Sequence, residues 1–195
     1  MTHRRFCMGR RLSGFTLIEL MVTIAIASIL LMIAAPSFVS FQRNSELTSL
    51  ANSFIAAVNA TRGEAMKVGR RAMAVPADGT NWSKGWTVFV DSNGNSTLDT
   101  TTDRIVLQQA ALASYFTASG SGTAGATPPY VLFDASGYAK TKTAGFGALT
   151  LTITRNDLSG ADQTAQTRRI VIAKTGRARV CRPATDATCT TTAEE

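Results

Sequence analysis

Histidine is almost absent from this chain of 195 residues. The single histidine is His3, and no Gly-x-Ser-x-Gly elbow occurs in the sequence. None of the three cysteines has a general base beside it. Hydrolytic and acyl-transfer enzymes need a nucleophile next to a base, so the sequence argues against both kinds of catalysis. We therefore expect a protein that is not an enzyme and that needs no cofactor.

Charge is also almost absent from residues 15–35, where Glu19 is the only ionisable side chain. An apolar run of this length can cross a bilayer core of about 30 Å as a helix. A secretory signal peptide is disfavoured, because the run is long and no small-x-small cleavage site follows it before Pro36. A plain membrane anchor is the alternative, although a carboxylate in the bilayer costs roughly 2.5 to 3.5 kcal/mol and tends to be functional.

Four arginines precede the apolar run, and they are Arg4, Arg5, Arg10 and Arg11. Because basic residues stay on the cytoplasmic side of a membrane, this flank keeps the N-terminus inside and exports the rest of the chain.

The junction between the basic flank and the apolar run reads Gly-Phe-Thr-Leu-Ile-Glu, residues 14–19. This motif resembles the class III signal of type IV pilins and type II secretion pseudopilins. The resemblance implies that a prepilin peptidase cleaves after Gly14 and methylates the amine of Phe15. It also implies that Glu19 attracts the N-terminal ammonium of a neighbouring subunit, since unlike charges attract strongly at low dielectric. Residues 1–14 are then a cleaved leader.

Removal of the leader changes the charge and cysteine content. The formal net charge falls from +7 to +3 when the four leader arginines are lost. Cys7 leaves with the leader, whereas Cys181 and Cys189 reach an oxidising periplasm, where they can close a small loop as a disulfide. Two free thiols are the alternative.

The chain after Pro36 predicts a second helical segment, residues 37–69, followed by a β-rich head, residues 70–195. Apolar and small residues at a spacing of three and four form one helix face, which we expect to pack against the head. This stripe consists of Leu47, Ala51, Phe54, Val58, Thr61 and Ala65. We expect the membrane-spanning segment to be residues 15–36 and the amphipathic helix to end at Gly69.

In the head the apolar period changes to two. Six segments are rich in β-branched and aromatic residues: Ala72–Val75, Trp86–Val90, Ile105–Gln109, Tyr130–Phe133, Ala148–Thr154 and Arg168–Ala173. One long helix followed by six strands indicates an α+β fold with mostly antiparallel pairing. Residues 118–127 are rich in Gly, Ser and Thr, and we expect them to form an exposed flexible loop.

Three further segments resemble blocks of one branch of the same family, the pseudopilin H/FimT group. They are NATRGEAMK at residues 59–67, GWTVFVDSNGN at 85–95 and FDASG at 133–137. The resemblance favours this group over the major pilins. It implies a pilin-like fold, in which a long N-terminal helix, membrane-spanning in its first half, packs on a mostly antiparallel β-sheet head.

Two patterns that suggest ligand sites are set aside. Residues 91–102 have the spacing of a calcium loop, but Ser96 replaces the required Gly and Thr102 the required Glu, so a hairpin turned on residues 93–94 is preferred. Residues 120–125 satisfy Gly-x-Gly-x-x-Gly, but two prolines follow where a helix should begin. We expect no metal site.

Basic residues gather near the C-terminus, with no acid between Asp162 and Asp186. Arg177 and Arg179 would share one face of an extended segment about 7 Å apart, close to the spacing of adjacent phosphates. The segment 176–179, Gly-Arg-Ala-Arg, also resembles the GRxR element of FimT-type minor pilins that bind DNA in natural transformation. The predicted DNA-binding residues are Lys174, Arg177, Arg179 and Arg182. A solvated strand face that prevents aggregation is the alternative.

These inferences leave two functional hypotheses. In the first, the protein is a structural subunit of a type IV pilus or a type II secretion pseudopilus. In the second, it also binds DNA through the C-terminal arginines. Both place it as a single-pass protein of the bacterial inner membrane with its head in the periplasm, and later in a pilus or pseudopilus. The expected partners are other pilin or pseudopilin subunits and the prepilin peptidase.

Overall fold

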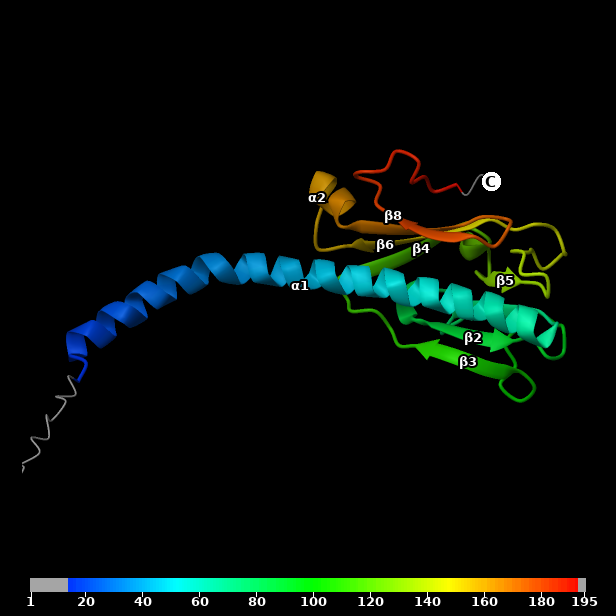
Figure 1. The fold of residues 1–195 in the computed structure, drawn as a ribbon, viewed down its shortest axis with the longest axis horizontal. Coiled ribbons are helices and arrows are strands. Elements are labelled where there is room, and N and C mark those ends of the chain that lie inside the picture. Colours follow the sequence, from blue (N-terminus) through cyan, green and yellow to red (C-terminus); the bar gives the residue numbers. More distant parts are fainter. Residues whose placement is uncertain (1–13, 193–195) are drawn as a thin grey trace, which may run out of the picture. The chain divides into compact units, whose positions relative to one another are not determined.

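The computed structural model describes residues 14–192, apart from the side chain of Pro36. The predicted leader therefore lies outside the described residues, except for Gly14. The chain forms two compact units, residues 1–42 and 43–195. Figure 1 shows the helices and strands of both units.

One long helix, α1 (Leu17–Val68), begins in the first unit and ends in the second. In the first unit its described side chains are almost all exposed. An 18-residue window of α1 has a mean hydropathy of 2.6 and no buried residue, so α1 is long and apolar enough to cross a membrane. Because α1 continues through Pro36, the predicted span (15–36) and the predicted amphipathic helix (37–69) are consecutive parts of one element.

The second part of α1 buries the predicted apolar stripe. All six residues of the stripe are at most 1 % exposed, which confirms the prediction. At its centre, the ring of Phe54 meets Trp82 and Trp86 edge to face, with centroids 5.5 and 5.1 Å apart. Such aromatic pairs stabilise a core beyond their buried area.

The helix ends at Val68, and Gly69 takes a left-handed conformation with φ of +65°. The backbone N–H of Arg70 then donates to the carbonyl of Ala65 at 3.3 Å, which closes the last turn. Glycine adopts this conformation without the steric cost that a Cβ would bring, so the predicted stop at Gly69 is confirmed.

Two four-stranded sheets complete the head, and every pairing among their described strands is antiparallel. Sheet A has the order β3-β2-β1-β5 and consists of β1 (Ala72–Pro76), β2 (Trp86–Val90), β3 (Arg104–Gln109) and β5 (Val131–Phe133). Sheet B has the order β4-β6-β7-β8 and consists of β4 (Phe116–Gly122), β6 (Leu149–Arg155), β7 (Thr167–Ile172) and β8 (Ala178–Cys181). The predicted α+β fold is confirmed, and each of the six predicted strands is present.

The inner faces of both sheets join the stripe of α1 in one apolar core. Figure 1 shows this part of α1 running along the two sheets, with β2 and β3 on one side and β6 and β8 on the other. Three short helical turns connect the strands: η1 (Trp82–Lys84), η2 (Thr123–Gly125) and α2 (Gly160–Ala165). A single helix thus closes the open face of two sheets.

The prediction of a flexible loop at residues 118–127 is wrong. Residues 118–122 belong to β4, and η2 follows directly. Phe116 and Ala118 are buried on the core face, while Thr117 and Ser119 face outward, as period-two alternation requires. Gly120 permits the close packing of η2, because a Cβ at this position would lie 2.0 Å from the carbonyl oxygen of Ala124.

A polar network fixes α1 to the end of sheet B. Asp157 accepts two hydrogen bonds from Arg155, at 3.0 and 2.6 Å, and one from Arg43 of α1 at 2.6 Å. The hydrogen bonds of Arg155, and then those of Arg43, lower the pKa of Asp157 well below its ordinary value, although burial acts in the opposite direction. Beside them the hydroxyl of Tyr115 donates to Glu46 of α1 at 2.5 Å.

Asp157→Asn should destabilise the head by about 2 to 4 kcal/mol at pH 7, because it removes the carboxylate that pairs with the 3 %-exposed side chain of Arg155. The pKa of Asp157 is depressed by folding, so its contribution is complete above the unfolded value of about 4 and is lost as pH falls below that value. Urea unfolding followed by tryptophan fluorescence measures this difference. We expect the difference between wild type and variant to shrink between about pH 5 and pH 2.

Asp162→Asn on α2 is the matched control, since Asp162 is exposed. It should change the free energy of unfolding by less than about 0.5 kcal/mol. An equal loss of stability at pH 7 and pH 2 in the Asp157→Asn variant would contradict the assigned role of the carboxylate.

Candidate functional site

The N-terminal candidate site is built at the start of α1. Thr16 stands immediately before the helix and Glu19 lies in its first turn. Glu19 Oε2 accepts hydrogen bonds from the backbone N–H and the hydroxyl of Thr16, both at 2.9 Å, and the N–H of Glu19 donates to Thr16 Oγ1 at 3.3 Å. This reciprocal capping box satisfies N–H groups that the helix start leaves free. It also holds the carboxylate at the positive end of the helix dipole.

Gly14 and Phe15 precede the cap and lie outside the helix. Nothing lies within 4 Å of a Cβ built on Gly14, and Phe15 is 82 % exposed. Gly14 and Phe15 thus lie in an exposed, non-helical segment just before the helix that carries Glu19, and proteases reach backbone of this kind. Cleavage after Gly14, methylation of Phe15 and the assembly role of Glu19 stay predictions.

The C-terminal basic residues do not form one surface, because Arg168 points into the core. It is 2 % exposed, and its guanidinium donates to Asn44 Oδ1 at 2.8 Å and to Thr48 Oγ1 at 3.4 Å on α1. Burial lowers the pKa of Arg168. The sequence holds a signal for this position, since Arg168 is an even number of residues from Ile170 and Ile172 in the same strand, and both isoleucines are buried in the core.

Two other arginines hold the segment after β8 against the outer face of sheet B. We call residues 182–192 the C-terminal tail. Arg169 donates to the carbonyl of Cys189. Arg179 donates to the carbonyl of Thr188 at 2.8 Å and pairs with Asp186 at 3.2 Å. The side chain of Arg179 is therefore already bound to the tail.

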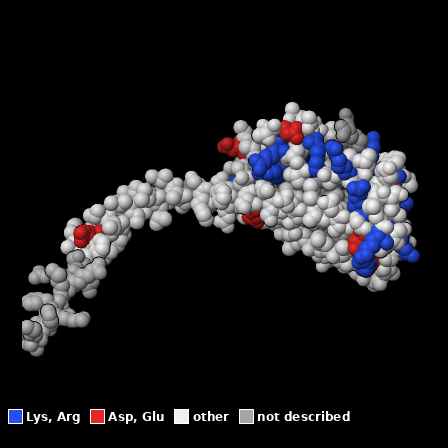
Figure 2. Space-filling view, viewed as in Figure 1, with Lys and Arg blue, Asp and Glu red and all other residues white. Residues whose placement is uncertain are grey.

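The other predicted DNA-binding residues, Lys174, Arg177 and Arg182, are exposed. Arg177 and Arg179 do have the same parity, as predicted, but Arg179 is held by the tail while Arg177 faces solvent. Figure 2 shows that lysine and arginine side chains lie at separate places over this face of the head. The predicted basic cluster is thus divided between the core, the tail and the surface.

Cys181 and Cys189 are joined by a disulfide with an S–S distance of 2.00 Å, which confirms the predicted bond. Their sulfurs and the carboxylate of Asp186 lie within 4.8 Å of one another, a spacing that could hold a metal ion. Each sulfur, however, is already bonded to the other, and Asp186 pairs with Arg179. Since metal ligation by cysteine needs a free thiolate, this cluster does not fit a metal while the disulfide is formed.

The loop between β2 and β3, residues 91–103, uses its carboxylates for its own backbone. Asp91 accepts from the N–H groups of Gly94 and Ser96, at 2.7 and 2.9 Å, and Asp103 accepts from two more N–H groups of the loop. β2 and β3 do pair as a hairpin, but this whole loop joins them in place of the tight turn we predicted. The carboxylate oxygens of Asp91 and Asp103 thus order the backbone of the loop.

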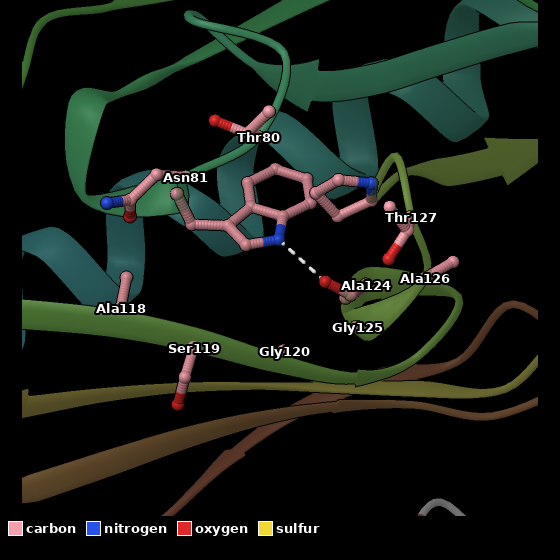
Figure 3. A pocket seen from close by; sticks show the side chains of 11 residues that line it. Thr80, Asn81, Ala118, Ser119, Gly120, Ala124, Gly125, Ala126 and Thr127 are labelled. Atoms are coloured by element: carbon pink, nitrogen blue, oxygen red, sulfur yellow. Dashed lines mark hydrogen bonds between the residues drawn. The ribbon is translucent and has the colours of Figure 1, made fainter.

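A shallow hollow of about 290 Å³ lies between η1, β4 and η2, and Figure 3 shows its lining. The indole N–H of Trp82 donates to the carbonyl of Ala124 at 2.8 Å, which joins two of its walls. No lining residue is ionisable. The hollow therefore offers shape and backbone groups but no acid, base or metal ligand.

Comparison with known proteins agrees with this architecture. A family model described as type II transport protein GspH matches residues 50–176, and a model of the prokaryotic N-terminal methylation motif matches residues 9–35. A comparison with curated protein sequences gave no match.

Two solved structures share the fold. The type IV minor pilin FimU of Pseudomonas aeruginosa is 20 % identical with a TM-score of 0.52, over 72 % of this chain and 92 % of FimU. The minor pseudopilin EpsH of the Vibrio cholerae type II secretion system is 16 % identical with a TM-score of 0.51, over 70 % of this chain and 94 % of EpsH. Because the family model covers about two thirds of the chain and the methylation motif covers its start, the protein belongs to the GspH family of minor pilins and pseudopilins.

Proposed function

We propose that the protein is a minor subunit of a type IV pilus or of the related type II secretion pseudopilus. One observation carries the proposal: α1 begins three residues after Gly14, exposes an apolar surface, and holds Glu19 as the single ionisable side chain of its first part. A helix of this kind is stable only if lipid or other apolar helices cover it. Membership of the GspH family supports the same role.

The proposed path begins in the inner membrane. The subunit spans the bilayer once with its N-terminus in the cytoplasm, the prepilin peptidase cleaves after Gly14, and the head folds in the periplasm. The disulfide between Cys181 and Cys189 supports an oxidising compartment for the head.

Glu19 then directs entry into the filament. Its carboxylate is expensive to bury alone, so a partner of opposite charge, the N-terminal ammonium of a neighbouring subunit, relieves the cost. The Thr16 hydroxyl holds one oxygen, Oε2, at the helix start, which orients the carboxylate before it meets its partner.

Gly14→Val should stop processing, because a branched side chain replaces the small residue on which we expect the peptidase to act. Mass spectrometry of the membrane-bound chain should show a precursor that retains residues 1–14 and an unmethylated Phe15. A normal mature mass from the variant would refute the proposed cleavage site. Gly63→Ala, at a glycine of α1 outside the signal where an added Cβ meets nothing within 4 Å, is the control and should be processed normally.

Glu19→Ala should abolish incorporation into filaments while leaving the head folded, with the disulfide formed. Glu19→Gln separates two roles, because glutamine keeps the capping box but carries no charge. If the charge is what assembly requires, both variants should be missing from sheared filaments, as measured by immunoblotting. Normal incorporation of Glu19→Gln would show that the carboxylate acts as a helix cap and not as a charge.

DNA binding through Lys174, Arg177, Arg179 and Arg182 stays a hypothesis from the sequence, and no contact among residues 14–192 favours it over the structural role. Arg179 is bound to the tail, so only Arg177 of this pair is free to contact a phosphate. Replacing both with Gln should therefore flatten the slope of log DNA affinity against log salt concentration by about one unit, the value for one phosphate contact. Fluorescence anisotropy of labelled duplex DNA in rising salt measures this slope. Arg70→Gln with Arg71→Gln is the matched control, and an equal loss in both double variants would indicate only diffuse charge.

A further inference from the structure

A small hairpin extends the head beyond β5. We call residues 139–147 the end hairpin. Lys140 and Phe146 form an antiparallel bridge, and Ala139 forms another with Phe133 of β5. The N–H of Thr141 donates to the carbonyl of Gly145 at 2.8 Å, which closes the turn. These hydrogen bonds give the end hairpin a defined conformation.

Two aromatic side chains are exposed on and beside the end hairpin. Phe146 is 57 % exposed and Tyr138 is 43 % exposed, with their ring centroids 5.6 Å apart and their planes at 76°. Lys140 fixes this pair, since its Nζ lies 3.8 Å from the centroid of Phe146 and 3.5 Å from the carboxylate of Asp134. The rings are thus held in place before any partner arrives.

More positive charge lies beside the rings. The Nζ of Lys142 lies 5.0 Å from the ring centroid of Tyr130, and the N–H of Ala139 donates to the carbonyl of Lys174 at 3.1 Å. The turn that carries Lys174 and Arg177, both exposed, is therefore a direct neighbour of the end hairpin. We define the end surface as these six residues: Tyr138, Phe146, Lys140, Lys142, Lys174 and Arg177.

The end surface fits an anionic partner. It has four cations. The carboxylate of Asp134 lies beside them and is already paired with Lys140. The turn after β7 also packs tightly on the turn before the end hairpin, because a Cβ on Gly176 would lie 2.2 Å from the carbonyl oxygen of Gly137. The backbone turns that carry Lys174, Arg177 and Tyr138 are consequently held at fixed separations.

The ring geometry selects among anionic partners. Stacked bases of a single strand lie parallel to one another, whereas the planes of Tyr138 and Phe146 are 76° apart and one face of Phe146 is covered by the ammonium of Lys140. The two rings therefore cannot both serve as a stacking platform for successive bases. Segments that bind a bilayer surface are amphipathic helices or longer apolar faces, and their lysines are free to extend toward the headgroups. Lys140 and Lys142 are instead held over aromatic rings.

A protein surface suits the same geometry. Interfaces are rich in tyrosine, phenylalanine and arginine, and their energy is concentrated in a few aromatic anchors. Side chains that are already ordered lose little conformational entropy on binding, which favours the end surface as an anchor.

We propose that the end surface binds a carboxylate-bearing face of the head of a neighbouring pilin-type subunit, an inference that rests on the proposed function. The apolar anchor is the ring pair, and Lys174 and Arg177 meet the carboxylates. Contacts of this kind decide which neighbour binds, since opposite charges steer association and like charges prevent it.

Photo-crosslinking of the full chain in cells tests the inference. The probe is p-benzoylphenylalanine in place of Phe146, which keeps an aromatic ring at the site. We expect crosslinks to a subunit with a pilin-type N-terminal signal, at a segment of its head that contains Asp or Glu. Lys174→Glu with Arg177→Glu should lower the crosslink yield about tenfold or more, which is the size of a hot-spot loss.

The matched control is Lys84→Glu with Arg182→Glu, two exposed cations outside the end surface, and it should leave the yield unchanged. Protease resistance and the disulfide report whether each variant is folded. Reversal of the crosslinked acid on the partner to lysine should restore the yield of the Lys174→Glu, Arg177→Glu chain.

Crosslinks only to phospholipid or nucleic acid, or a yield that charge reversal does not change, would overturn the inference. So would normal entry into filaments with no crosslink to a subunit. Absence of the unmodified chain from purified filaments is a different result, because it would overturn the proposed function itself.

Discussion

The head depends on one helix stripe that packs against two sheets at once. Each sheet has an apolar inner face, and the stripe centred on Phe54 covers both. Full burial of a large apolar side chain contributes about 1.5 to 3 kcal/mol. Leu47, Phe54 and Val58 of the stripe are therefore a major part of the stability. The helix that we propose as the membrane anchor is thus also the core of the head. Packing in the head fixes the C-terminal part of this helix, and the capping box of Thr16 and Glu19 defines where the helix begins.

Much of this could be predicted, because it depends on local periodicity. The stripe of α1 and the inward side chains of Ile170 and Ile172 follow from periods of 3.6 and two, and all are buried. The stop at Gly69 follows from its freedom to take positive φ. The N-terminal signal depends on six consecutive residues, so no tertiary contact was needed to find it.

The missed features depend on contacts between distant residues. Composition made β4 look like a loop, but Gly120 is there because η2 packs on it closely. Arg168 lies in the basic stretch that begins after Asp162, but its contacts with Asn44 and Thr48, more than a hundred residues away, place it in the core. In the end surface, backbone hydrogen bonds place Lys174 next to the hairpin that carries Phe146, and no sequence pattern predicts these bonds.

The tail has a practical consequence for labelling. Besides its bonds to Arg169 and Arg179, its Thr191 carbonyl accepts from Ser121 at the end of β4, so the tail lies on the outer face of sheet B. A fluorescent protein or affinity tag fused after the tail would therefore start close to the contacts that hold the tail on this face. A tag inserted in an exposed loop leaves those contacts undisturbed and is the better reporter of this subunit.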